Sequence, residues 1–501
     1  MNRRDFLQDL AAAAAAAASL PARALASEGQ AFDDAVKSAP WLTPFKGVGD
    51  ATQDLHCDAL TLSGRWPAAL RGRFYRNGPA LFERDGQRYR HWFAGDGMVQ
   101  QFGFSGGSRP VVRHVGRLVR TPKLLAEQRA GRFLVPAYGT HIDSEAPTRG
   151  PDTFNVANTN AIEHAGRVLA LWEGGSAFAL DPADLSTTGP VTWQPGLEQM
   201  PFSAHPKVDA EGHLWNFGTS GSKLVVWHID PRGALVRAQV GDSPYPGGMA
   251  HDAAITAQHI VLPLPPIKLR FGEDVSTAFE VHPDEPLRIL VMRKDDIGQR
   301  RVFELPNQMV FHVGNAWERP DGSIVLSYVA SETPGFAVRG AAQLVAGHAA
   351  PASVSNTRIA TLDMRTGRAS VEAMDDAVEF PRMHPQRIGV RARYLASAAS
   401  WVPGRNGSAL FHGVQLRDLD TGRVARHDYG RDTVVEEHIV VPKPGGRDEL
   451  DAWLLGTTFD VRRQVSRVNV LDARHVGDGP IAQATLPYLL PYGFHGNFTA
   501  A

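Results

Sequence analysis

Cysteine is nearly absent from this chain of 501 residues, which contains only Cys57. An intramolecular disulfide framework is therefore excluded, as is any zinc or iron–sulfur site built from several cysteines. Neither sign of charge is in excess, because 52 Lys and Arg balance 53 Asp and Glu. We therefore expect neither a basic surface for nucleic acid nor an acidic solvating tail. Beyond the N-terminus no apolar run is long enough to span a bilayer, so we expect the mature protein to be soluble or peripheral.

The N-terminus has the pattern of an export signal. Arg3 and Arg4 form a twin-arginine pair, an alanine-rich stretch follows, and Ala24-Leu25-Ala26 offers a small-residue cleavage site. A membrane anchor is the alternative, but the apolar run is short and mostly alanine. We therefore predict export to the periplasm. The predicted organisation is a twin-arginine signal peptide at 1–26, a segment at 27–66 that wraps the outside of the fold, and one catalytic domain at 67–501.

Helical periodicity is rare, and Pro122–Arg132 is the best helix candidate. Short β-rich runs are instead separated by turns that carry Asp, Pro and Gly. Examples of such runs are residues 168–172, 213–217, 223–227, 323–328 and 452–456, and examples of such turns are 209–212, 230–233, 319–322, 363–367 and 418–422. These turns are typical of antiparallel strands. The pattern predicts an all-β fold, and its spacing favours a β-propeller of four-stranded blades. A pair of β-sandwiches is the alternative.

Four of the 19 histidines stand out by their surroundings: His205, His251, His312 and His495. Each lies among apolar or small residues, as an interior metal ligand would. Any one of them also fits a satisfied core or turn histidine. They are far apart in the sequence and form no local metal motif such as two histidines one helical turn apart. The residues alone indicate a possible dispersed histidine site.

Several segments together resemble the carotenoid cleavage oxygenase family, which includes apocarotenoid oxygenases, lignostilbene dioxygenases and the retinoid isomerase. The similarity runs from about Gly72 to the C-terminus. It rests on Gly72–Pro79 (GRFYRNGP), His91–Met98 (HWFAGDGM), Asn158–Asn160 (NTN) and Leu169–Gly175 (LALWEGG), followed by the four histidine segments in the family's order. A single string of this kind would be weak evidence, whereas the ordered set is specific.

The resemblance implies a seven-bladed β-propeller with Fe(2+) on its central axis and loops and short helices capping one face. It makes His205, His251, His312 and His495 the metal ligands. It also implies three carboxylates that hydrogen-bond the outer ring nitrogens, at Glu173, Glu379 and Glu437. Such a carboxylate fixes the ring and raises the basicity of the ligand. Because Glu436 precedes Glu437 directly, the choice between these two neighbours stays open.

The activity implied is oxidative cleavage of a C=C bond by O2, giving two carbonyl products. Lignostilbene dioxygenases pair a tyrosine with a lysine to bind a phenol. Tyr138 fits the tyrosine, but Trp172 stands at the position of the lysine, so a carotenoid or apocarotenoid is favoured over a stilbene or another phenylpropenoid alkene. The sequence is also compatible with a non-oxidative isomerase or hydrolase, with a propeller that only binds a ligand, and with another metal in the cage.

The expected partners are a lipophilic small-molecule substrate and O2, with peripheral membrane contact. Leu262–Leu269 is the candidate for an apolar membrane patch, because Lys268 and Arg270 could meet lipid headgroups there. An ordinary proline-rich loop is the alternative interpretation of this segment.

Overall fold

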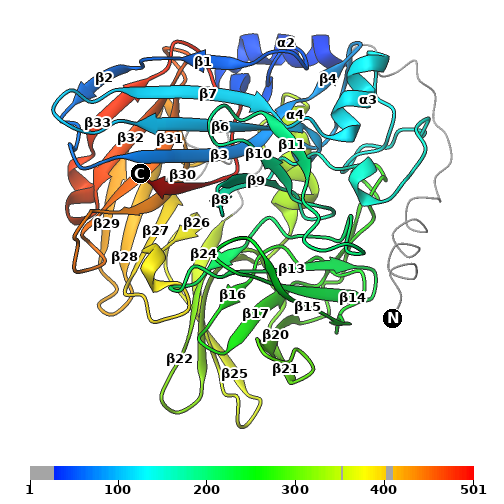
Figure 1. The fold of residues 1–501 in the computed structure, drawn as a ribbon, viewed down its shortest axis with the longest axis vertical. Helices are drawn as coiled ribbons and strands as arrows, with labels where there is room; N and C mark the ends of the chain where they lie inside the picture. Colours follow the sequence, from blue (N-terminus) through cyan, green and yellow to red (C-terminus); the bar gives the residue numbers. More distant parts are fainter. Residues whose placement is uncertain (1–27, 351–353, 402–409) are drawn as a thin grey trace.

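The structure is a computed structural model that describes residues 28–350, 354–401 and 410–501. Its strands form seven antiparallel sheets of four or five strands each, which we call blades 1 to 7, and two short ribbons (Figure 1). The all-β, seven-bladed β-propeller expected from the sequence is therefore confirmed. The predicted signal peptide, residues 1–26, lies outside the described residues.

The blades are composed as follows. Blade 1 contains β1 Leu55–Cys57, β7 Val112–Leu118, β6 Asp96–Phe104, β3 Gly72–Leu81 and β34 His495–Ala500. Blade 2 contains β11 Thr187–Pro190, β10 Phe178–Leu180, β9 Arg167–Leu171 and β8 Asn160–His164. Blade 3 contains β12 Lys207–Val208, β13 Leu214–Ser220, β14 Lys223–Ile229 and β15 Leu235–Asp242. Blade 4 contains β16 Ala254–Ile255, β17 His259–Leu264, β20 Leu287–Arg293 and β21 Arg300–Leu305; blade 5 contains β22 Met309–Glu318, β23 Ile324–Ser331, β24 Ser355–Leu362 and β25 Ala369–Ala373. Blade 6 contains β26 Val378–Arg382, β27 Tyr394–Ala399, β28 Gly413–Asp418 and β29 Val424–Asp428; blade 7 contains β30 Thr433–Pro442, β31 Ala452–Asp460, β32 Val465–Asp472, β33 Pro480–Thr485 and β2 Thr61–Gly64.

Short helices and the two ribbons complete the described elements. They are α2 Glu28–Ser38, α3 Pro122–Ala130, α4 Ala341–Val345, the 3-10 segments η2 Pro40–Phe45, η3 Trp92–Ala94, η4 Pro151–Thr153, η6 Pro385–Arg387 and η7 Ala473–Asp478, the π-helical turn η5 Phe336–Gly340, and the ribbons β4 Glu83–Arg84 with β5 Gln87–Arg88 and β18 Ile267–Leu269 with β19 Phe279–Val281. Among these described helices, none has the length and apolar character needed to cross a membrane.

The two ends of the chain close the ring together. Strand β34 pairs with β3 in blade 1, and β2 pairs with β33 in blade 7. Figure 1 shows the blue N-terminal strands beside the red C-terminal strands. Within residues 28–66, β1 is an outer strand of blade 1 and β2 is the outer strand of blade 7, whereas α2 and η2 pack with η3 and α4.

Each blade packs on its neighbours through a buried apolar layer. One such layer joins blades 2 and 3 through Leu169, Leu171, Leu214 and Trp227, and the remaining neighbouring pairs are joined by similar clusters. Strands in the middle of a blade, such as β23, are buried along almost their whole length because both of their faces are covered. The innermost strands of the blades contact one another around the axis, as β30 of blade 7 does with β26 of blade 6 and β34 of blade 1. Their ends therefore meet at the centre of the ring.

The turns between strands follow the chemistry expected from the sequence. At Asp230–Gly233 the Asp230 carboxylate accepts hydrogen bonds from the backbone N–H groups of Arg232 and Ala234, at 2.9 and 2.8 Å. Gly233 has a φ of +83°, a conformation that a residue without a side chain adopts at little cost. The predicted helix at Pro122–Arg132 is also present, as α3.

The candidate membrane segment is not an exposed apolar patch. Leu262, Leu264 and Ile267 are buried within β17 and β18. The Lys268 ammonium lies over the ring of Tyr245, 5.5 Å from its centroid. Arg270 pairs with Glu280. The sequence interpretation of this segment was wrong because the apolar residues of a proline-rich stretch pack into the core and are not left on the surface.

Candidate metal centre

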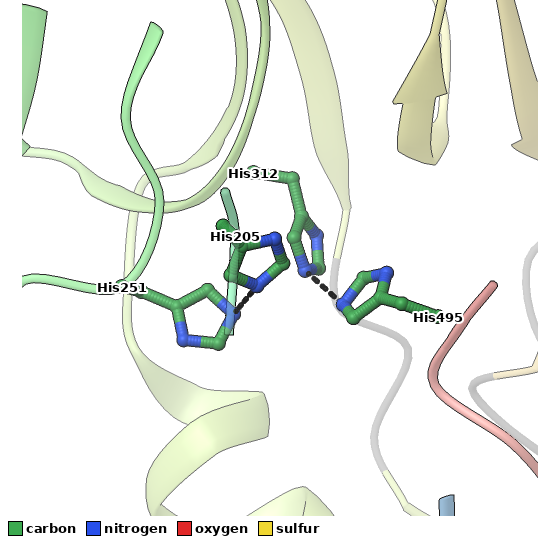
Figure 2. A group of neighbouring side chains, drawn as sticks. All are labelled: His205, His251, His312 and His495. Carbon is green, nitrogen blue, oxygen red and sulfur yellow. Dashed lines mark hydrogen bonds between the residues drawn. The ribbon is translucent and has the colours of Figure 1, made fainter. Parts of the chain in front are cut away.

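Four histidine rings from four different blades converge at the centre of the propeller (Figure 2). His205 precedes β12, His251 precedes β16, His312 lies in β22 and His495 begins β34. One nitrogen of each ring lies within 4.8 Å of the corresponding nitrogen of every other ring. The Nε2 atoms of His205 and His251 are 3.1 Å apart, as are those of His312 and His495. The structure therefore brings together all four histidines that the sequence singled out.

Carboxylates hold the outer nitrogens of three of these rings. Glu379 Oε2 lies 2.6 Å from His312 Nδ1, and Glu437 Oε1 lies 2.9 Å from His495 Nδ1. Glu173 contacts Nδ1 of His251. These are the three glutamates expected from the resemblance. Glu436 turns instead toward Arg76 and Thr457, so Glu437 is the neighbour that faces the cage.

This arrangement fits a bound cation. A carboxylate only accepts hydrogen bonds, so Nδ1 of each of these three rings carries the proton and its Nε2 keeps a lone pair. Two lone pairs that face each other at 3.1 Å, as in His312 and His495, repel unless a cation lies between them. Two nitrogens bound at right angles to one transition-metal ion at about 2.1 Å would lie about 3.0 Å apart. The donor set therefore suits one metal ion held by four imidazoles.

Irregularities in the inner strands aim these side chains. The pairing register shifts on both sides of Val313 in β22, between Glu379 and Arg382 in β26, and between Val435 and His438 in β30. Each shift is a β-bulge or a similar irregularity, which turns side chains out of the regular alternation. Within the bulge of β26, Phe380 has a φ of +57°, and its N–H donates to Glu379 Oε2 at 2.6 Å. These irregularities accompany the turn of His312, Glu379 and Glu437 toward the histidine cage, where Glu379 contacts His312 and Glu437 contacts His495.

Burial and neighbouring charges set the protonation of the cage. Burial, together with the other imidazoles, lowers the pKa of His205 well below its usual value. Burial also lowers the pKa of His495 to about 3, although Glu437 opposes this shift. At His251 burial acts in the same direction, but the carboxylates of Glu173, Asp252 and Glu379 together outweigh it and the pKa is raised. Glu437 is also buried, yet Arg382 and His495 hold its pKa well below the usual range. His205 and His495 are therefore neutral at pH 7, as metal ligands must be.

An apolar cavity adjoins the histidines. His251, His312 and His495 form part of its wall, together with Tyr138 and Trp172, the two residues that the sequence placed in the substrate pocket. The other aromatic side chains of the wall are Trp92, Phe93, Phe311, Phe336, Phe380, Phe411, Tyr492 and Phe494. No lysine or arginine belongs to the described lining. The segments η3 and η5, which bear Trp92 and Phe336, cover the cavity from the side where α2 and α4 pack.

Comparison with known proteins assigns the family. The family model RPE65, described as retinal pigment epithelial membrane protein, matches residues 49–500. The apocarotenoid-15,15'-oxygenase of Synechocystis sp. is 30% identical over 87% of this chain and 92% of the relative. The lignostilbene-alpha,beta-dioxygenase isozyme III of Sphingomonas paucimobilis is 27% identical over 94% of this chain and 98% of the relative. A cobalt-substituted Synechocystis apocarotenoid oxygenase has a similar structure, with a TM-score of 0.80 at 26% identity over 92% of this chain and 98% of that one.

The chain belongs to the carotenoid cleavage oxygenase family.

The resemblance inferred from the sequence is therefore confirmed, as is the assignment to oxygenases of this class. Sequence reasoning missed other residues of the centre, notably Arg382, Lys207 and Asp252. Arg382 Nε donates to Glu437 Oε1 at 2.9 Å, and Lys207 Nζ donates to Asp252 Oδ1 at 2.7 Å. A signal was present in the sequence, because Lys207 lies two residues after one candidate ligand and Asp252 directly follows another. Charged residues beside a buried ligand need partners of their own.

Proposed function

We propose that this oxygenase holds iron(II) in the four-histidine cage and cleaves a C=C bond of a carotenoid or apocarotenoid with O2, giving two carbonyl products. The observation that carries the proposal is the position of the cage: three of its four rings form one wall of an apolar, aromatic cavity. A polyene lying along that wall would present its double bonds to the metal. The Synechocystis relative, named as an apocarotenoid-15,15'-oxygenase, supports this choice of substrate.

Four neutral imidazoles also suit zinc, copper and nickel. A dioxygenase reaction needs a metal that exchanges electrons with O2, which excludes zinc. Among the remaining metals we propose iron because the family resemblance implies it. When bound, iron(II) supplies the activation of O2. The protein's own tasks are then to fix the rings through Glu173, Glu379 and Glu437, to hold the alkene in register, and to exclude water.

The charge of the cavity supports a polyene over a phenolic alkene. A phenolate needs a cation for its charge, and the described lining offers no lysine or arginine. Trp172 occupies the wall where phenol-cleaving relatives were expected to carry a lysine. An apolar polyene requires no such partner and gains about 25 cal/mol for each Å² of apolar surface that it buries.

Oxidative cleavage of a stilbene or other phenylpropenoid is the second candidate, and Tyr138 is the observation that favours it. Burial, and then the Glu173 carboxylate, raise the pKa of Tyr138 well above its usual value. Its hydroxyl therefore stays protonated and could donate a hydrogen bond to a substrate oxygen. The lignostilbene dioxygenase relative supports this second candidate.

Aerobic incubation of the iron-loaded protein with carotenoids, apocarotenals, hydroxystilbenes and isoeugenol would distinguish the candidates. We expect mass spectrometry to detect two carbonyl products from an apocarotenal, with 18O from labelled O2 in the products. Selective cleavage of the phenolic alkenes would favour the second candidate. An isomerised or hydrolysed product without oxygen consumption would contradict both. The variant His251→Ala should lose both iron and turnover, and a variant that keeps both would remove this ring from the ligand set.

We also propose that the protein is exported by the twin-arginine route. Arg3, Arg4 and the alanine-rich stretch after them support export. Cell fractionation should find the wild-type protein in the periplasm and an Arg3→Lys, Arg4→Lys double variant in the cytoplasm. Equal cytoplasmic retention of both would contradict the proposal.

A further inference from the structure

One carboxylate, that of Asp252, links three of the four segments that carry the ring ligands. It directly follows His251 in the chain. Its Oδ2 accepts the N–H of Val313, the residue after His312, at 2.8 Å. Its Oδ1 accepts Lys207 Nζ at 2.7 Å, two residues after His205. The Asp252 side chain is 3% exposed, so water does not replace these bonds.

The ring of His205 depends on this link more than the other rings do. The nearest carboxylate oxygen, Asp252 Oδ1, lies 3.8 Å from His205 Nδ1, which is beyond hydrogen-bonding distance. Only the backbone of this segment is tied directly to the cage, because Ser203 Oγ accepts the N–H of His205 and donates to the carbonyl of His251, both at 3.2 Å. The orientation of the His205 ring therefore depends on where its segment lies. The Lys207–Asp252 pair is one of the contacts that fix this segment, together with the bond from Asn160 Nδ2 to the carbonyl of Ala204 at 2.7 Å.

The charges around the cage support the same role. Four carboxylates lie against the rings or their segments: Glu173, Glu379, Glu437 and Asp252. Two cations accompany them, since Lys207 pairs with Asp252 and Arg382 pairs with Glu437. The shell therefore keeps two negative charges around the four imidazoles, which are neutral when they bind a metal, and a divalent cation would neutralise these charges. Uncompensated buried charge is costly, so this balance lowers the cost of holding the metal.

We propose that Asp252 is a positioning residue of the metal centre, which sets the place of His205 through Lys207 and locks it to the segment of His312 through Val313. The inference rests on the proposed metal centre. It gives a role to the fourth carboxylate near the cage, which holds the segments that carry the ligands, whereas the three glutamates contact the rings themselves. Asp252 contacts neither the substrate cavity nor the inner ring nitrogens.

Positioning and counter-charge predict opposite effects for Lys207→Met. This change makes the shell more negative, so charge alone would tighten binding of a divalent metal. It also releases the segment of His205, so positioning predicts weaker binding. We expect Lys207→Met to weaken cobalt(II) binding and Lys207→Arg to restore it. We expect Asp252→Asn to weaken binding by about 10- to 100-fold, the usual effect of losing such a supporting group. This change removes the charge and leaves one acceptor oxygen, so the side chain can no longer accept from Lys207 and Val313 through separate oxygens.

The test uses the full-length protein titrated with cobalt(II) alone. The readouts are the dissociation constant, the rate of cobalt loss to a chelator, and the visible absorption bands, which report the ligand geometry. The matched control is the pair of Lys443, which follows β30, and Asp472, the last residue of β32, 2.9 Å apart. Lys443→Met should leave all three readouts at wild-type values. Lys207 is 17% exposed and tolerates substitution better than buried Asp252. If the Asp252 variants fold poorly, the cobalt affinities of the Lys207 variants still decide the test.

The outcomes separate the two proposals. A wild-type protein that binds neither cobalt nor iron would overturn the metal centre itself, and this inference with it. Normal metal binding by the wild type, together with unchanged affinity, release rate and absorption bands in Asp252→Asn, would overturn the inference alone. So would a Lys207→Met variant that binds cobalt as tightly as the wild type or more tightly. Weaker binding with shifted bands in both variants, restored by Lys207→Arg, would support it.

Discussion

The ion pair between Glu437 and Arg382 offers a quantitative test of how the cage is built. Glu437 accepts hydrogen bonds from three donors: His495 Nδ1 at 2.9 Å, Arg382 Nε at 2.9 Å and the N–H of Gly496 at 2.8 Å. The side chain of Glu437 is 1% exposed and that of Arg382 is 26% exposed. The pair is therefore largely shielded from water.

Removing both partners should cost no more stability than removing one of them. Breaking a buried pair leaves an uncompensated charge and costs about 3–5 kcal/mol. Because Arg382 is partly solvated, we expect Glu437→Gln to cost the lower figure, about 3 kcal/mol, and Arg382→Met a similar amount. The double variant leaves neither charge unpaired, so we expect it to lose about 3 kcal/mol as well, not the sum of about 6.

Urea unfolding of the metal-free proteins measures these free energies. The slope of the transition should be compared between the variants. A coupling energy near 3 kcal/mol is expected from the double-variant cycle. If the two single losses add to within about 0.5 kcal/mol in the double variant, the two groups act independently. This result would refute the reasoning that Arg382 keeps Glu437 ionised where Glu437 contacts His495.

Three further predictions concern the cavity and the core. At Phe380, whose φ is +57°, the Gly variant should be about 1 kcal/mol more stable than the Ala variant, because Ala resists that conformation; equal melting temperatures would contradict this. Tyr138→Phe should leave apocarotenal turnover unchanged but lower turnover of any phenolic alkene up to about tenfold, the effect of one lost hydrogen bond, as product assays would show. Burial, and then His56, lower the pKa of His114 to about 3. The unfolded chain therefore binds a proton below about pH 6.5 that the folded protein excludes. Stability should fall toward pH 4, and His114→Gln should reduce that slope by about 1.4 kcal/mol per pH unit in urea unfolding.

The sequence was sufficient for the fold class but not for the number of blades. Turns such as Asp230–Gly233 contain the residue types that determine their geometry. Runs such as Ile324–Ser331 are mostly apolar because both faces of the strand are covered. These are local signals. The blades, in contrast, share an architecture without sharing recognisable sequence, because each inter-blade layer packs its own set of side chains. The number seven followed from the family resemblance alone.

The candidate site was likewise predictable from the sequence only in part. The four histidines could be singled out by their apolar surroundings, but only the resemblance joined them, because their proximity arises from blades that are far apart in the chain. Arg382 and Asp252 were missed because a charged side chain in a sequence gives no sign of its partner. The left-handed Phe380 was missed because its conformation arises from the bulge in β26 and not from its own preference.

The position of His495 connects metal binding to closure of the propeller. This residue begins β34, the strand that joins the C-terminus to β3 through pairs running from Asn77–His495 to Gly72–Ala500. A metal that binds only the folded state stabilises it by about 4 kcal/mol when its free concentration is 1,000 times its dissociation constant. Because the cage ties β34 to blades 3, 4 and 5, removing the metal should increase hydrogen exchange most strongly at the β34 amides. The amides of β20, in the middle of blade 4, should change little below the limit of global unfolding. An equal increase in hydrogen exchange in both strands would show that the metal stabilises the whole propeller and not β34 in particular.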